Sequence, residues 1–308
     1  MIIPVILSGA SDNPVSPAKT AERVENKAFF SSPIVIGSQA HAEFLDRTMI
    51  GHLPACTVLE PFGRHTAAAI AIAALLAFEI EPQTPMLVLP TDHAINNNDA
   101  FLQAVHLTTP LVDAGYIITF GIKPTGPNTQ YGYIEKGAEI PEHEFAKRIS
   151  SFVEKPDQEK ARAMLETGHF YWNSGIVMAT AETLLDEFTR FAPEVLAACR
   201  DTLAHSPEQE NIITLSPEFF EKVPRVAFDV AVLEKTQKAV VLPAAFDWVD
   251  FETQDNNSIQ GKHVHLEKGV TNVFVNNETD QVVKITGVSD ISVILTKDGV
   301  VITSNKKV

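Results

Sequence analysis

Residues 56–93 read CTVLEPFGRHTAAAIAIAALLAFEIEPQTPMLVLPTDH and contain two short apolar runs on either side of an alanine-rich stretch. Thr57–Leu59 and Met86–Leu89 predict strands, because short apolar runs bounded by proline and glycine are typical of buried strands. Ala67–Phe78 is apolar on nearly every side, which predicts a helix buried against a sheet. Strand, helix and strand in this order indicate a mostly parallel α/β sheet.

The same alternation continues outward through roughly the first four-fifths of the chain. Further strands are expected at Ile2–Leu7, Pro33–Ile36, Tyr116–Gly121, Ser151–Val153, Ser174–Met178 and Ala239–Leu242, and helices at Ala100–Ala114, Gln158–Thr167 and Ala181–Phe191. After about Asn256 the pattern changes to short Val/Ile strands, at Val264–Leu266, Val273–Val275, Val282–Ile285, Val293–Leu295 and Val300–Thr303. We therefore predict an α/β domain at 1–255 and a small all-β appendage at 256–308, built as a β-solenoid or a β-meander.

Composition limits the class of protein. The chain has 308 residues, 45% hydrophobic and 20% charged, as in a packed globular protein. Its net charge of −15 would repel a polyphosphate backbone, so no nucleic-acid partner is expected. Cys56 and Cys199 suggest neither a disulfide framework nor a zinc site. The apolar N-terminus has no basic residue before Lys19, and no apolar run reaches the ~20 residues of a membrane span, so we expect a cytoplasmic protein without a membrane partner.

The apolar run that begins at Met86 ends in an acid, Asp92. Ligands of open α/β sheets bind beyond the carboxyl ends of the strands, so Asp92 lies where Mg²⁺ or a ribose hydroxyl would be held. The alternative is a helix N-cap, a position at which Asp is common.

Glu60 and Arg64 lie between a strand and the alanine-rich helix. Thr66 is the expected N-cap of that helix, and a helix N-terminus beside an arginine can bind an anion or the polar edge of a base. In the alternative interpretation, Glu60 and Arg64 pair with each other across the turn.

Three further stretches carry side chains suited to a phosphorylated sugar. Gly132 lets a ligand approach the backbone. Glu154 and Lys155, as an exposed pair, can hold a hydroxyl and a phosphate, and Asn173 offers a donor and an acceptor. These residues lie in YGYI at 131–134, FVEKP at 152–156 and YWNSG at 171–175.

In these stretches the chain resembles the mannose-1-phosphate guanylyltransferases of the nucleotidyltransferase superfamily. The resemblance covers essentially the whole chain and includes IPVILSG at 3–9, EPFGR at 60–64, LPTDH at 89–93, FDVAVLEK at 228–235 and DWVD at 247–250. It implies a Rossmann-like domain with a mixed, mostly parallel sheet. The implied reaction is transfer of GMP from GTP to mannose 1-phosphate, giving GDP-mannose and pyrophosphate.

The resemblance also implies roles for individual residues. Asp92 and Asp250 would hold Mg²⁺ beside the α-phosphate, and Lys19 would be a further catalytic residue. Glu154 and Lys155 would bind the sugar phosphate, Gly132, Asn173 and Asp229 the mannose, and Gly9, Glu60, Arg64 and Thr91 the nucleotide. In such a transfer, positioning and charge neutralisation supply most of the acceleration. The expected partners are GTP, mannose 1-phosphate and GDP-mannose, and a homodimer is considered as the assembly.

One stretch departs from the pattern of that family. The family has GGxGxRLWPxSR followed by PKQ, whereas residues 9–19 read GASDNPVSPAK. The second and third glycines and the loop arginine, which would surround the triphosphate with N–H groups and positive charge, are absent. A non-catalytic homologue that binds or senses nucleotide sugars is therefore the alternative function.

Overall fold

The computed structural model describes residues 1–9, 17–49, 51–52, 54–95, 97–250, 258–277, 279–296 and 299–304. Their contacts divide the chain into a large unit, made mostly of residues 1–248, and a small unit that contains residues 92–94, 249–250 and the described residues from 258 to 304. The predicted boundary between residues 255 and 256 lies outside the described residues and stays a prediction.

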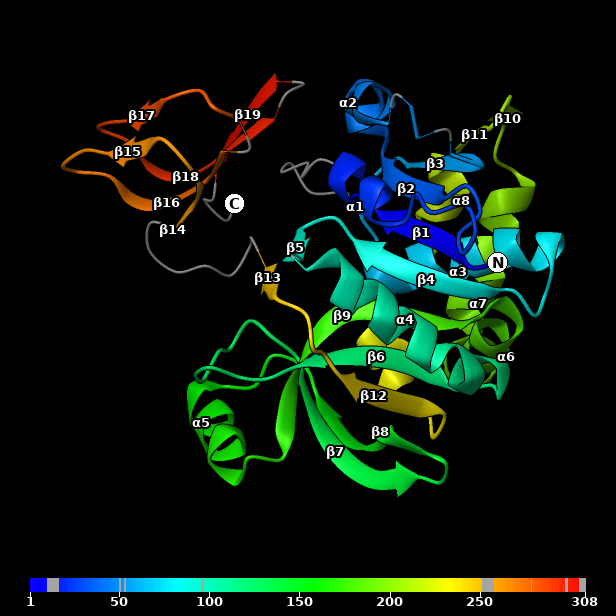
Figure 1. Ribbon diagram of the computed structural model, residues 1–308. Coiled ribbons are helices and arrows are strands. Elements are labelled where there is room, and N and C mark those ends of the chain that lie inside the picture. Colours follow the sequence, from blue (N-terminus) through cyan, green and yellow to red (C-terminus); the bar gives the residue numbers. More distant parts are fainter. Residues whose placement is uncertain are drawn as a thin grey trace. The chain divides into compact units, whose positions relative to one another are not determined.

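An 11-stranded mixed sheet runs through the described part of the large unit, in the order β10-β11-β3-β2-β1-β4-β9-β6-β12-β8-β7 (Figure 1). The strands are β1 (Ile3–Leu7), β2 (Ile34–Ser38), β3 (Cys56–Glu60), β4 (Pro85–Pro90), β6 (Ile117–Ile122), β7 (Tyr133–Ile140), β8 (His143–Val153), β9 (Phe170–Thr180), β10 (Glu208–Gln209), β11 (Ile212–Thr214) and β12 (Ala239–Pro243). From β11 to β4 all neighbours are parallel, whereas β9 is antiparallel to both β4 and β6. The predicted mixed α/β sheet is thus confirmed, but among the described strands its parallel pairs, from β11 to β4 and between β6 and β12, are no more numerous than its antiparallel ones.

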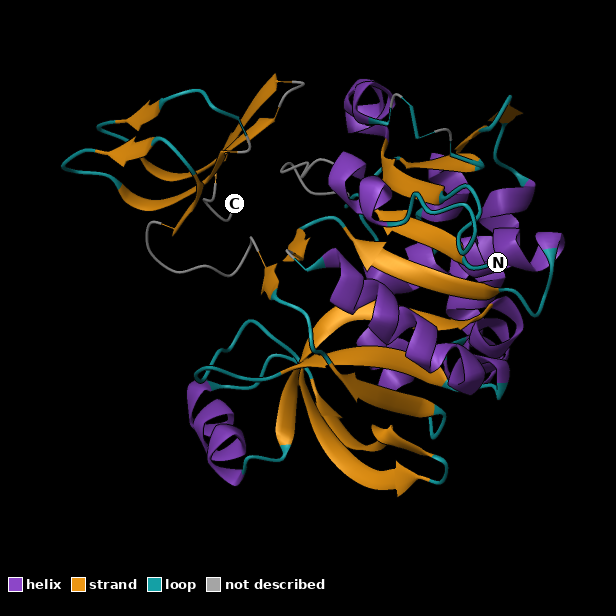
Figure 2. Cartoon of the chain, in the orientation of Figure 1, coloured by secondary structure: helices purple, strands orange, loops and turns teal. Residues whose placement is uncertain are grey.

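Helices cover both faces of this sheet (Figure 2). The helical elements are α1 (Pro17–Arg23), η1 (Gln39–His41), α2 (Ala42–Thr48), α3 (His65–Ile80), α4 (Asn98–Asp113), α5 (Gln158–Thr167), α6 (Ala181–Phe191), α7 (Pro193–Ala204), α8 (Pro217–Phe220) and η2 (Asp229–Leu233). One core holds buried residues of α3, α6 and α7, and the opposite face packs α4 against the same strands. The sheet is therefore the middle layer between two layers of helices.

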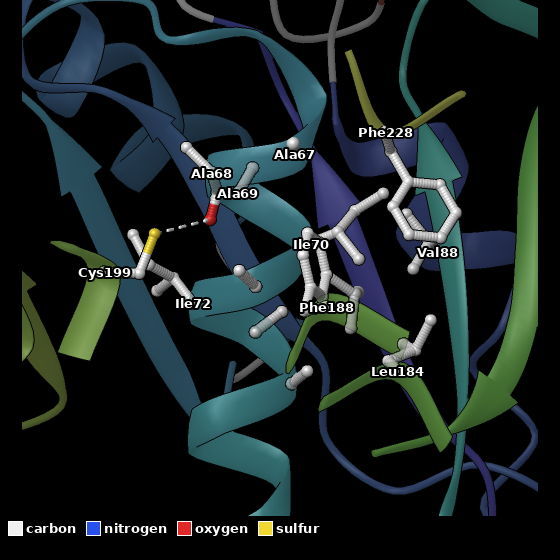
Figure 3. Packing of buried hydrophobic residues seen from close by; sticks show 14 of the residues in the cluster. Ala67, Ala68, Ala69, Ile70, Ile72, Val88, Leu184, Phe188, Cys199 and Phe228 are labelled. Carbon is white, nitrogen blue, oxygen red and sulfur yellow. Dashed lines mark hydrogen bonds between the residues drawn. The ribbon is translucent and has the colours of Figure 1, made fainter. Parts of the chain in front are cut away.

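Helix α3 forms the centre of the first core (Figure 3). Its alanines have no side-chain volume beyond Cβ, so the helix can pack closely against its neighbours, and Ala67, Ala71 and Ala74 are completely buried. Near its N-terminus the Cys199 Sγ of α7 faces the Ala68 carbonyl oxygen at 3.8 Å. The predicted buried helix is confirmed.

The small unit contains parallel strands stacked along the chain. β14 (Ser258–Gly261), β16 (Thr271–Asn277) and β18 (Ser289–Thr296) are parallel neighbours, and β15 (Val264–Leu266) pairs in parallel with β17 (Val283–Ile285). β19 (Gly299–Ser304) is antiparallel to β18. Successive neighbours in a meander are antiparallel, so the solenoid interpretation holds. Its valine-rich core includes Val273, Val275 and Val293.

β5 (His93–Ile95) and β13 (Trp248–Asp250) pair with each other in a two-stranded sheet. Both cysteines are free thiols, with Cys199 buried and Cys56 half-buried. Among the described residues, no helix has the length and apolar character required to cross a bilayer.

Candidate functional site

The carboxyl ends of β3, β1 and β4 bring the predicted nucleotide-side residues to one edge of the sheet. Gly9 follows β1 with a positive φ of 61°, Glu60 ends β3, and Thr91 follows β4 and donates its backbone N–H to the Leu7 carbonyl at 3.2 Å. Because β9 runs in the opposite direction beside β4, its first residues, including Asn173, lie at the same edge. This edge is where ligands of open α/β sheets bind.

A hydrogen-bonded cluster joins residues from separate segments. Asn173 Nδ2 donates to Asp229 Oδ1 at 2.8 Å, and the Asn173 backbone N–H donates to the Gly132 carbonyl at 2.8 Å. A Cβ on Gly132 would lie 2.8 Å from Glu154 Oε2, so the Glu154 carboxylate lies directly against this glycine. Gly132, Glu154, Asn173 and Asp229, which the sequence predicts as sugar-binding residues, are therefore one cluster.

Lys155 extends this cluster toward solvent. Its Nζ lies 3.8 Å from Glu154 Oε1, and its side chain is 59% exposed against 25% for Glu154. The pair is thus less exposed than expected, because its carboxylate is largely buried. Lys155 has a positive φ of 44°, which is strained for a residue with a long side chain. Such strain is concentrated at functional sites.

The carboxylates of the cluster disfavour one another. Burial, followed by the charges of Glu154 and Glu234, raises the pKa of Asp229 to about 7, against the lowering effect of its own backbone N–H and of Asn173. Burial also raises the pKa of Glu154, an effect that Lys155 opposes and Glu234 increases. The Asp229 carboxyl therefore exchanges its proton near neutral pH, and carboxyl groups with such perturbed pKa values are common at functional sites.

Two local irregularities place the Asn173 and Asp229 side chains. Gly175 adopts φ 71°, and the pairing of β9 with β6 shifts register between Thr119 and Gly121, the sign of a bulge that re-aims side chains. Asp229 begins η2, a single turn of π-helix that is closed by a hydrogen bond from the Glu234 N–H to the Asp229 carbonyl at 2.9 Å. Such turns occur frequently at functional sites.

Glu60 and Arg64 do not pair, so the structural alternative for these two residues is wrong. Arg64 donates to the carbonyl oxygens of Phe220 at 3.3 Å and Glu221 at 2.6 Å, and its guanidinium lies 4.9 Å from the Phe62 ring centroid. Glu60 is buried, its Oε1 has no hydrogen-bond partner, and burial raises the pKa of its carboxyl to about 8.

The prediction that Thr66 is the N-cap of α3 is also wrong. The capping position is Arg64, without a side-chain hydrogen bond, and Thr66 Oγ1 instead accepts the backbone N–H of Phe228 at 2.9 Å. The next helical N–H, that of Ala67, donates to the Val226 carbonyl at 3.3 Å. A segment distant in the sequence thus packs on this helix end and takes the Ala67 N–H, one of the donors that an anion would use.

Asp92 immediately precedes β5, and Asp250 is the last residue of β13, the strand that pairs with β5. Asp92 Oδ1 is buried without a hydrogen bond and lies 3.3 Å from His93 Nε2. Asp92 caps no helix, because the N-cap of α4 is Asn97, so that alternative is wrong. The Asp250 side chain lies outside the described part, as do residues 10–16 of the atypical loop, while Lys19 is exposed on α1.

A buried carboxylate oxygen without a hydrogen bond fits a hard cation such as Mg²⁺. Within the described ranges, no group of three or more His, Cys, Asp or Glu side chains is arranged to hold a metal ion. A metal site at Asp92 and Asp250 therefore stays a prediction.

Sequence reasoning did not find Thr119 or Glu234, which both act on members of the cluster. Thr119 Oγ1 donates to Asn173 Oδ1 at 2.8 Å, and Glu234 acts on Asp229 through its charge. Thr119 lies inside an otherwise apolar strand, where a single threonine carries no signal. Glu234 belongs to the FDVAVLEK stretch, so that stretch was the available signal.

Residues 18–250 match the family described as Nucleotidyl transferase. The chain belongs to this family. The match begins beyond most of the atypical stretch at 9–19, and it contains the whole hydrogen-bonded cluster. The resemblance noted in the sequence and the fold that it implied are thereby confirmed.

Curated relatives of this nucleotidyl transferase carry a more specific name. The chain is 33% identical over 290 residues to a mannose-1-phosphate guanylyltransferase of Klebsiella pneumoniae, and the match covers 89% of this chain and 61% of the relative. It is 37% identical to the mannose-1-phosphate guanylyltransferase ManC of Salmonella typhimurium, covering 88% of this chain and 59% of the relative. The chain thus spans about 60% of the length of these relatives.

The structure of this chain is similar to the crystal structure of mannose-1-phosphate geranyltransferase from Thermus thermophilus. The TM-score is 0.71 at 23% sequence identity, over 99% of this chain and 95% of the other. This similarity supports the fold along nearly the entire chain.

Proposed function

We propose that this protein transfers GMP from GTP to mannose 1-phosphate, giving GDP-mannose and pyrophosphate. The observation that carries the proposal is the convergence of Gly132, Glu154, Asn173 and Asp229, from four separate segments, at the ligand-binding edge of the sheet. Membership of the nucleotidyl transferase family and identity of 33–37% to proteins named mannose-1-phosphate guanylyltransferase support the same reaction.

On the sugar side of the site, we expect hydrogen bonds to the mannose hydroxyls and a charged contact to the phosphate. Asp229 and Glu154 would accept hydrogen bonds from mannose hydroxyls, and the Gly132 backbone leaves room for the sugar ring because it has no Cβ. The exposed Lys155 ammonium would bind the sugar phosphate as a point charge. Glu60, Arg64, Gly9 and Thr91 would lie toward the nucleotide.

The chemical step is a displacement at the α-phosphorus of GTP. An oxygen of the mannose 1-phosphate phosphate forms the new bond to that phosphorus, and the bond to the β-phosphate oxygen breaks, releasing pyrophosphate. Mg²⁺, bound at Asp92 and Asp250, would neutralise the phosphate charge. The chain itself orients the two anions, and Lys155 and Lys19 would supply local positive charge in a protein of net charge −15.

A pyrophosphate-release assay tests the proposal. GTP, mannose 1-phosphate and Mg²⁺ together should release pyrophosphate, while omission of the sugar phosphate or excess EDTA should abolish release. Lys155→Gln should lower kcat/KM for mannose 1-phosphate about tenfold or more, because a charged contact is lost, and leave the KM for GTP nearly unchanged.

Lys160→Gln is the matched control. Lys160 is also an exposed lysine beside an acid, at 3.7 Å from Asp157, but it belongs to α5 and not to the cluster. Its removal should change neither constant by more than about twofold, as for an ordinary exposed ion pair. Absence of turnover with intact binding of GDP-mannose would instead favour the non-catalytic sensor.

We also propose a reducing, cytoplasmic location and a homodimer. The location is supported by the two free cysteines. Light scattering of the purified protein measures the assembly directly.

A further inference from the structure

Thr119 is a buried polar side chain behind the sugar-binding cluster. It lies in the middle of β6 with no exposed surface, between apolar neighbours. Its Oγ1 donates to Asn173 Oδ1 at 2.8 Å, and Asn173 Nδ2 donates to Asp229 Oδ1 at 2.8 Å. The three side chains thus form a short relay from the sheet interior to the carboxyl group that faces the site.

The direction of the relay is fixed by a backbone donor. The Gly175 N–H lies 3.3 Å from Asn173 Oδ1 and can only donate, so the oxygen of the amide must face Gly175 and Thr119. The amide nitrogen then faces Asp229. A turned amide would place two donors together at Gly175 and two acceptors together at Asp229, so both contacts select one orientation.

We propose that Thr119 is a positioning residue for sugar recognition: through Asn173 it holds the Asp229 carboxylate in place to accept a mannose hydroxyl. This proposal rests on the proposed function and adds a residue that does not touch the substrate. Burial has the largest effect on the protonation of Asp229, and neighbouring groups modify it. Asp229 faces the carboxylates of Glu154 and Glu234, and the Asn173 donor offsets part of their repulsion.

The other charged groups near Asp229 pair with residues other than Asp229. Lys155 pairs with Glu154, and Glu187 of α6, the helix packed on η2, contacts Thr236 and Lys238. Without the Thr119 hydroxyl the Asn173 amide turns more freely, and its bond to Asp229 is made less often. The pKa of Asp229 should then rise from its value of about 7, since that bond is one of the effects that lower it.

Thr119→Val tests the relay, because valine keeps the β-branched shape of threonine and replaces its hydroxyl with a methyl group. The KM for mannose 1-phosphate should rise about tenfold, the effect of one buried hydrogen bond, while the KM for GTP stays within about twofold. The acid limb of the pH profile for mannose 1-phosphate should move to higher pH. Thr119→Ser, which keeps a hydroxyl, should have nearly the wild-type KM for mannose 1-phosphate and the wild-type pH profile.

Thr108→Val is the matched control for a buried threonine in the same unit. Thr108 is also completely buried, but its Oγ1 bonds to the Ala104 and Val105 carbonyls and lies 3.5 Å from Met178 Sδ, without contact to the cluster. If Thr108→Val and Thr119→Val change the KM for mannose 1-phosphate and the KM for GTP equally, Thr119 has only a structural role and the proposal is overturned. An unshifted pH profile in Thr119→Val overturns it as well.

Binding of mannose 1-phosphate alone, measured by calorimetry, separates this proposal from the proposed reaction. If the wild-type protein binds the sugar phosphate without turnover, the reaction is wrong, and a tenfold weaker affinity of Thr119→Val still supports the relay. If the wild-type protein does not bind mannose 1-phosphate, the relay has no sugar to position and both proposals fail.

Discussion

At the scale of single residues, Glu60 combines deep burial with an unsatisfied oxygen. Its side chain is 5% exposed, and the nearby Arg64 is bound to backbone carbonyls instead. A buried, unpaired carboxylate is costly, and the protein avoids the charge by keeping the proton. The raised pKa of about 8 follows from this burial.

Protonation of Glu60 should make the stability of the protein depend on pH. Its folded-state pKa of about 8 lies above the ordinary value of 4.5, so between these values the folded chain binds a proton that the unfolded chain lacks. The free energy of unfolding should therefore fall as pH rises through this window, by about 1.4 kcal/mol per pH unit at most. Denaturant unfolding of wild type and Glu60→Gln at several pH values measures it.

In Glu60→Gln this slope should become shallower, because glutamine cannot ionise, and the remainder is expected from Asp229, whose pKa is also raised. Glu79→Gln is the control, since Glu79 is exposed at the far end of α3 and should leave the slope unchanged. Identical slopes in wild type and Glu60→Gln would show that Glu60 is ionised in the folded protein.

At the scale of elements, the sequence pattern predicts helices better than long strands. Helices α5 and α6 have the predicted bounds, Gln158–Thr167 and Ala181–Phe191. Strand β7 was not predicted, because Glu135, Lys136 and Glu139 interrupt its apolar pattern and its pairing with β8 is irregular. Its position is determined by tertiary pairing with β8 and β9 rather than by its own residues.

The site follows the same rule. Motif stretches predicted Gly132, Glu154, Asn173 and Asp229 as a group, and the structure joins them. The wrong predictions concern side chains whose hydrogen-bond partners come from distant parts of the chain. Thr66, for example, accepts a hydrogen bond from Phe228, more than 150 residues away. Local patterns carry the identity of a side chain, but not the distant segment that packs on it.

The β9 bulge gives an element-scale prediction. Gly175 holds φ 71°, a conformation that costs a residue with a Cβ about 1–2 kcal/mol. Gly175→Ala should lower the free energy of unfolding by this amount. It should also weaken binding of mannose 1-phosphate, because the bulge aims Asn173. Denaturant unfolding and calorimetry measure the two effects.

Gly168→Ala is the control that separates the cost of backbone strain from an effect on the geometry of the site. Gly168 has a similar φ of 67°, at the C-cap of α5, and nothing lies within 4 Å of its added Cβ. It should lose comparable stability without weakening sugar binding. Equal loss of binding in both variants would mean that the bulge has no special role at the site.

At the scale of the whole molecule, the proposed function requires a chain with few cations to bind two anionic substrates. It carries 24 Lys and Arg against 39 Asp and Glu. Near the site, Arg64 is already bound to two carbonyl oxygens, and Lys155 shares its charge with Glu154. The global field should therefore oppose the approach of GTP and mannose 1-phosphate, and local contacts must overcome it.

This field makes the salt dependence of the proposed reaction a test of the whole charge distribution. Added salt shortens the screening length from about 30 Å at 0.01 M to about 8 Å at 0.15 M, which weakens repulsion across the molecule more than contacts within the site. At fixed excess Mg²⁺, the KM for mannose 1-phosphate should therefore fall by about twofold between these salt concentrations. Guanosine, which is uncharged, should bind equally well at both. A KM that rises with salt would mean that local cations such as Lys155 dominate the field that the substrates meet, in spite of the net charge of −15.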